Sequence, residues 1–83
     1  MTTLPTVEEY KLALDCMVDD GAITIEAAVI LLTVFRNHTQ ERPTHVKQLM
    51  AVSGLDWKHV NWVLNGLCMR GAIKKIEDNY YTL

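Results

Sequence analysis

One short segment, residues 56–69, contains most of the side chains that could recognise another molecule. They are Trp57, Lys58, His59, Asn61, Trp62 and Asn65. An asparagine amide can form two hydrogen bonds with the edge of an adenine, and a lysine can donate to guanine or to a phosphate. If the segment is a helix that enters the major groove of DNA, these side chains lie off its buried face. The segment therefore predicts a DNA-binding surface.

Three further residues could hold the phosphate backbone beside such a helix. Thr44 stands at the start of a predicted helix, where its hydroxyl and the free N–H groups favour an anion. Lys74 and Lys75 stand at the base of a predicted hairpin. Residues 44–83 carry five basic and three acidic side chains, a net +2, whereas residues 1–43 carry three and seven, a net −4. The half that would contact DNA is thus the basic half of a chain with net charge −2.

The sequence offers little for catalysis or for metal binding. It contains no nucleophile and base at a recognisable spacing and no glycine-rich phosphate loop. The candidate soft ligands are scattered, without a compact ligand spacing. They are His38, His45, His59, Cys16 and Cys68. We therefore expect no enzymatic activity, no metal and no cofactor, and we interpret the cysteines as buried thiols in a reducing cytosol.

The N-terminal half predicts two helices. Thr6 and Glu9 form a capping box at the start of the first, residues 6–20, and Gly21 can end it. Thr24 can cap the second, residues 24–38, which is apolar almost all round between residues 27 and 35. A helix of that composition is expected to be buried on most sides.

The C-terminal half predicts two helices joined by a tight turn, residues 44–69, and then a hairpin, residues 72–83. Ser53 and Gly54 end the first of these helices, and Asp56 caps the second. In the second, Val60, Val63, Leu64 and Leu67 recur at the spacing of one buried face. Asp78 and Asn79 can form a two-residue turn between short β-prone segments.

These elements indicate one domain, residues 1–83, that is mainly α with a small β-hairpin. The N-terminus lacks the basic and apolar regions of a signal peptide, and no apolar run is long enough to span a membrane. We therefore expect a cytoplasmic protein that has no membrane partner.

From about residue 24 onward the sequence resembles the winged helix-turn-helix regulators of the multiple-antibiotic-resistance repressor type. Residues 23–28, Ile-Thr-Ile-Glu-Ala-Ala, resemble the family's motif before its apolar helix. Residues 67–73, Leu-Cys-Met-Arg-Gly-Ala-Ile, resemble the motif that closes its recognition helix. Between them, residues 46–67 match the helix-turn-helix.

The resemblance implies a winged helix-turn-helix of four helices plus a two-stranded C-terminal wing. It implies a small transcriptional regulator that binds double-stranded DNA, with helix 56–69 in the major groove. Because the domain is small and such regulators commonly form symmetric dimers, we expect a homodimer through the N-terminal helices that reads a pseudo-palindromic site.

The chemistry of helix 56–69 leaves a second function open. Tryptophan and asparagine stand where the family has small hydroxyl residues and arginine, and the wing is short. The chain could instead be a winged-helix protein-interaction module of the kind found in phage or plasmid accessory proteins, with Trp57 and Trp62 as anchors for a protein partner. We expect Trp57 to pack against a neighbouring helix or the wing. Trp62 stands one position before the buried Val63, and a tryptophan that faces solvent there would mark an interaction surface.

Overall fold

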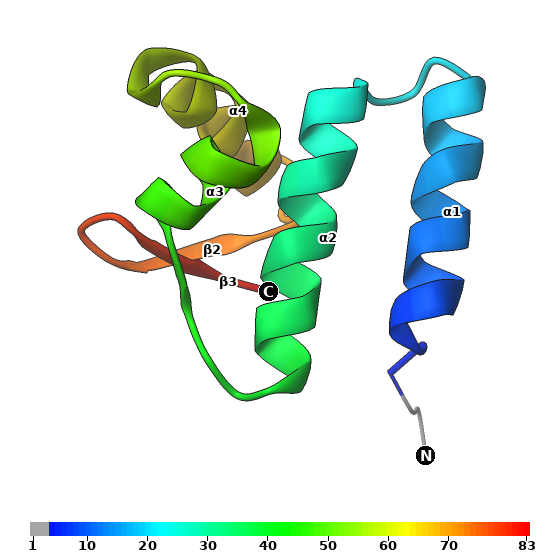
Figure 1. Cartoon of the computed structure of the whole chain (residues 1–83), viewed down its shortest axis with the longest axis horizontal. Coiled ribbons are helices and arrows are strands. Elements are labelled where there is room, and N and C mark those ends of the chain that lie inside the picture. Colours follow the sequence, from blue (N-terminus) through cyan, green and yellow to red (C-terminus); the bar gives the residue numbers. More distant parts are fainter. Residues whose placement is uncertain (1–3) are drawn as a thin grey trace.

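The computed structural model describes residues 4–83 and is mainly helical, with a small antiparallel sheet (Figure 1). Residues 1–3 of the predicted domain lie outside the described part. The elements are α1 (Val7–Asp19), α2 (Ile25–Thr39), β1 (Thr44–His45), α3 (Val46–Ser53), α4 (Trp57–Met69), β2 (Lys74–Glu77) and β3 (Tyr80–Thr82). The three strands pair in the order β1-β3-β2. Four helices and a C-terminal hairpin are present, as the sequence predicts, with one difference at the start of α3.

Side-chain caps set the starts of the long helices. The Thr6 hydroxyl accepts from the Glu9 amide, and the Glu9 carboxylate accepts from the Thr6 amide, both at 3.1 Å. The Thr24 hydroxyl accepts from the Ala27 amide at 3.1 Å. Each cap satisfies an N–H group that has no partner inside the helix. The predicted helices 6–20 and 24–38 are therefore correct to within one residue at each end.

The start of the predicted segment 44–69 is wrong, because Thr44 and His45 form a strand. Thr44 pairs with Tyr81 and His45 with Tyr80, so β3 is bordered by strands on both sides. The first helical residue of α3 is Val46, and the His45 ring nitrogen Nδ1 caps it by accepting from the Lys47 amide at 3.0 Å. The sheet therefore has three strands where the sequence predicts two.

Helix α2 lies at the centre of the core. Helix α1 packs against one side of it, and α3 and the sheet pack against the other (Figure 1). Ile30, Val34 and Phe35 of α2 are almost fully buried. The ring of Tyr10 from α1 stacks on Phe35 with 4.0 Å between centroids. This packing explains why α2 is apolar on most sides.

One buried polar cluster links α2 to β1 and α3. The Nδ2 group of Asn37 donates to the Thr44 hydroxyl and to the Gln48 Oε1 atom, both at 2.8 Å. Asn37 and Thr44 are buried, so neither can exchange these bonds for water. The cluster therefore fixes the short strand β1, and the start of α3, against the end of α2.

The Thr44→Val substitution tests this link. It keeps the shape of the side chain and removes the acceptor, which leaves one buried N–H of Asn37 without a partner. We expect a loss of about 1–3 kcal/mol in the free energy of unfolding, measured by urea denaturation. The control is Thr39→Val at an exposed threonine, with an expected change below about 0.5 kcal/mol. Equal losses in the two variants would contradict the proposed role of the cluster.

Candidate functional site on helix α4

Helix α4 buries one face and exposes the rest. Val60, Leu64 and Leu67 are buried, and Val63 is half-buried against the same core. Gly54, with φ of 72°, ends α3 in the left-handed conformation, so the chain turns sharply before Asp56 caps α4. The predicted buried face is confirmed, and the outer face of α4 is available for contact with another molecule.

The first turn of α4 uses some of the predicted recognition side chains for local bonds. The Asp56 carboxylate accepts from the His59 amide at 2.8 Å and lies 2.9 Å from the His59 ring nitrogen Nδ1. The backbone bond first, and the ring contact second, lower the pKa of Asp56 below its usual value. Asn61 donates from Nδ2 to the carbonyl oxygen of Trp57 at 2.8 Å. His59 and Asn61 are thus partly engaged within the helix, whereas Lys58 and Asn65 are exposed.

Both tryptophans of α4 face solvent. The exposed fraction is 56% for Trp57 and 76% for Trp62. The prediction that Trp57 packs against a neighbouring helix or the wing is therefore wrong, and Trp62, whose exposure the sequence left open, also faces solvent. Two large exposed rings on one helix are typical of a surface that binds another molecule.

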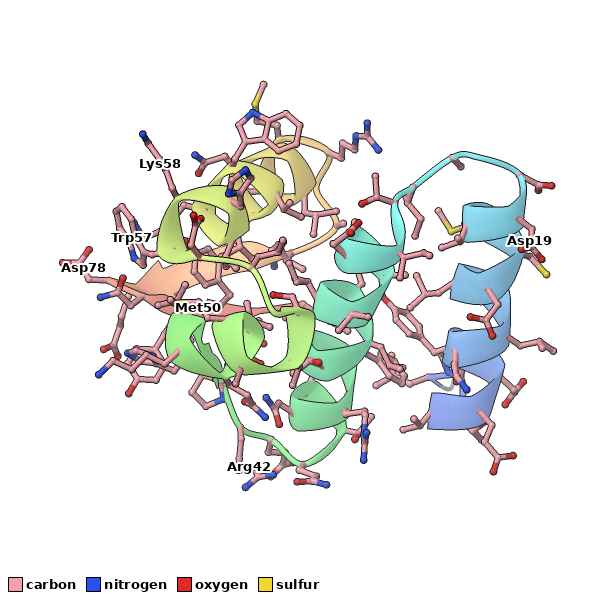
Figure 2. All side chains as sticks on the ribbon, turned by 45° about the horizontal axis from the view of Figure 1, so that its top comes forward. Asp19, Arg42, Met50, Trp57, Lys58 and Asp78 are labelled. Carbon is pink, nitrogen blue, oxygen red and sulfur yellow. The ribbon has the colours of Figure 1, made fainter. Side chains whose placement is uncertain are left out.

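The lysines near α4 lie far from the acidic helix α1. Figure 2 shows Trp57 and Lys58 projecting from α4 on one side of the molecule and Asp19 on the opposite side. Lys74 and Lys75 are exposed on β2, and the Lys75 Nζ atom lies 4.0 Å from Asp78 Oδ1. Helix α4 itself contains no acidic residue. The lysines of the C-terminal half and the acidic side chains of α1 therefore lie on opposite sides of the molecule.

Thr44 is not part of this surface. Its side chain is fully buried in β1, and its hydroxyl accepts the hydrogen bond from Asn37. Helix α3 begins at Val46, and the Lys47 amide in its first turn already donates to the His45 ring nitrogen Nδ1. A phosphate therefore cannot reach the Thr44 hydroxyl, and the prediction of a phosphate contact there is wrong.

An apolar groove runs between the second half of α4 and the residues that lead into α2. It has a volume of about 380 Å³, and Trp62, Gly66 and Met69 line its α4 side. Ile23 and Ala27 line the opposite side. Met69 is 88% exposed. This groove was not predicted from the sequence, although Trp62, Gly66 and Met69 stand at the i, i+4, i+7 spacing of one helix face.

The two cysteines lie in different surroundings. Cys16 is exposed on α1, so its predicted burial is wrong: α1 packs mainly against α2 and leaves its other side to solvent. Cys68 is half-buried, and its burial raises the pKa of the thiol. Within residues 4–83, no three histidine, cysteine or acidic side chains come together to hold a metal ion. None of the helices described in residues 4–83 has the length and apolarity to cross a membrane.

Comparison with known proteins adds no relative: no family model, no curated protein and no solved structure matches the chain. The surface of α4 is therefore the feature of this chain that bears most on its function.

Gly66 gives a test of whether the protein's own packing requires this groove. A Cβ atom added there would meet no other atom within 4 Å, and the glycine lies inside a helix. We expect Gly66→Ala to increase the free energy of unfolding by about 0.5–1 kcal/mol, because alanine loses less conformational entropy in a helix. Urea denaturation measures the change. A destabilised variant would mean that the internal packing needs the glycine.

Proposed function

We propose that this protein is a small DNA-binding transcriptional regulator with a winged helix-turn-helix fold, and that α4 is its recognition helix. Helices α3 and α4 supply the helix-turn-helix, and β2 and β3 supply the wing. The pairing of β1 with β3 supports this assignment, because it ties the hairpin to the strand that leads into α3. The hairpin and the first helix of the proposed helix-turn-helix are thereby joined through one sheet.

The observation that carries this proposal is the separation of charge across the molecule. Lys58, Lys74 and Lys75 are exposed in the half that contains α4, whereas α1 carries four of the chain's acidic side chains on the far side. A basic face of this kind attracts the phosphate backbone and orients the protein on it. The acidic helix is then directed away from the DNA.

The proposed role of each side chain follows from its exposure. Lys58 and Asn65 are placed to contact base edges or phosphates, and Lys74 and Lys75 to hold the backbone beside the wing. Trp57 and Trp62 would add apolar contact on either side of Lys58. His59 and Asn61 can take part only with the atoms that their local bonds leave available.

The proposed regulator acts in the cytoplasm as a homodimer, through binding and without catalysis. Three lysines per subunit can neutralise few phosphates, so a single subunit would bind weakly. A dimer would double that number and place two copies of α4 on the half-sites of a pseudo-palindrome.

Removal of one lysine tests the proposal. We expect Lys58→Gln to weaken binding to a labelled duplex and to reduce the slope of log affinity against log salt by about 0.9 for each phosphate that the variant no longer neutralises. Fluorescence anisotropy over a salt titration measures both quantities. The control is Arg42→Gln, which removes the same charge from the loop far from α4 (Figure 2). Wild-type protein that shows no salt-dependent binding at low ionic strength would contradict DNA binding.

A second candidate function is the binding of a protein partner through α4. The apolar groove at Trp62, Gly66 and Met69 favours it, because Gly66 costs helix stability without serving internal packing. A glycine there leaves room for a partner's side chain to approach the helix backbone. In this case Trp57 and Trp62 would be anchors of a protein interface.

The Gly66→Leu variant separates the two functions. It fills the groove with a good helix former, so we expect the fold to be retained and capture of a protein partner by the immobilised protein to be abolished. Lys58→Gln should leave such capture intact. Capture that survives Gly66→Leu but fails with Lys58→Gln would count against the groove and in favour of an electrostatic interaction.

A further inference from the structure

A second groove lies between α1 and α2, on the side of the molecule away from α4. It has a volume of about 500 Å³, and its α2 wall is an apolar stripe of Ile25, Val29 and Leu32. The three residues stand at i, i+4 and i+7, so they share one helix face. Ile25 is 65% exposed, while Val29 and Leu32 are half-buried. Leu32 packs in part against the core, so Ile25 is the most exposed residue of this stripe.

Charged residues of both signs border the groove. Lys11, Asp15 and Asp19 line its α1 side. Helices α1 and α2 run antiparallel, so Asp19 lies near the end of the groove that Ile25 occupies (Figure 1). Arg36 continues the α2 stripe at the opposite end, one turn beyond Leu32, where it is exposed.

The two ends of the groove therefore differ in charge. Asp15 and Asp19 make one end acidic, whereas Lys11 and Arg36 make the other basic despite Glu8, one turn before Lys11. None of these five side chains forms an ion pair within the described residues, where the pairs are His59–Asp56 and Lys75–Asp78. A partner for this groove should be apolar at its centre, basic at one end and acidic at the other.

We infer that the occupant is a second copy of this chain, related by a two-fold axis that crosses the groove. The two copies then run antiparallel, so the acidic end of each groove meets the basic end of the other. Lys11 of each copy pairs with Asp15 of the other copy. This ion pair therefore occurs twice, as a two-fold interface requires. The two apolar stripes cover one another at the centre. This interface gives the homodimer of the proposed function, on which the inference rests, a specific surface, and it requires no DNA.

Sedimentation equilibrium without DNA tests the apolar part of the interface. We expect wild-type protein to dimerise and Ile25→Lys to raise the dimer dissociation constant about tenfold or more, because the variant replaces an apolar side chain with a positive charge at the end of the groove that meets the partner's Arg36. The matched control is Leu12→Lys, since Leu12 is 67% exposed on α1 and does not line the groove. The control should dimerise like the wild type. Monomeric wild-type protein, or equal effects of the two variants, would overturn the inference.

A charge exchange tests the reciprocal pairs. Lys11→Glu places two acidic groups together twice in its homodimer, and Asp15→Lys does the same with two basic groups. Each variant alone should therefore dimerise more weakly than the wild type. An equimolar mixture should form a heterodimer that is more stable than either variant's homodimer. A mixture as weak as its components would overturn the antiparallel arrangement, and circular dichroism of each variant confirms that it is folded.

The result is separable from DNA binding. Lys58 lies on the opposite side of the molecule from the groove. The Lys58→Gln variant should therefore dimerise like the wild type and bind DNA more weakly. If DNA binding is absent but the charge exchange behaves as expected, the dimer stands and the proposed function fails. If DNA is bound but the wild type is monomeric, the inference fails and the proposed function stands.

Discussion

The need to cover helix α2 on most of its surface determines the rest of this structure. Its apolar residues extend almost all round the helix, so water must be excluded from several sides at once. Helix α1 covers one side, mainly through Leu14 and the stacked pair Tyr10–Phe35. The sheet and α3 cover another, and α4 completes the core with Val60 and Leu64. Each of these elements can bury only one of its faces in this way.

That arrangement leaves two surfaces on which apolar side chains are exposed beside charged ones, as in binding sites. The outer face of α4 carries exposed tryptophans and Lys58, with the lysines of β2 in the same half of the molecule. The α1–α2 groove retains an apolar stripe that is only partly covered, with Ile25 exposed and Val29 and Leu32 half-buried. The two surfaces lie on opposite sides of α2, so a dimer through the groove leaves both copies of α4 open to a second partner. The proposed association and the proposed DNA binding are therefore compatible in one molecule.

The sequence predicted the elements whose signals are local. Caps at Thr6, Thr24 and Asp56, and the apolar spacing of Val60, Leu64 and Leu67, each lie within a few residues of one another. Strand β1 could not be predicted in this way, because its partner Tyr81 is 37 residues away in the chain. The burial of Thr44 follows from the same distant pairing. Thr44 was predicted as a phosphate ligand because a hydroxyl before a helix looks the same in sequence whether or not it is buried.

The sequence predicted which face of helix 56–69 is buried. It did not predict which side chains on the outer face form local hydrogen bonds, or that a groove lies beside them. The exposure of both Trp57 and Trp62 depends on how closely neighbouring elements approach α4, which the spacing does not determine. The local bonds of His59 and Asn61 depend on rotamers that the spacing does not determine. The groove at Gly66 required the packing of α4 against the start of α2, which joins residues about 40 positions apart.

An NMR titration of the isotope-labelled protein with a short duplex at low salt tests whether α4 and β2 form a DNA-binding face. If they do, amide shift changes concentrate in Trp57–Met69 and Lys74–Glu77 and leave Val7–Asp19 unchanged. Shift changes centred on α1, or none at any DNA concentration, would contradict a DNA-binding face there.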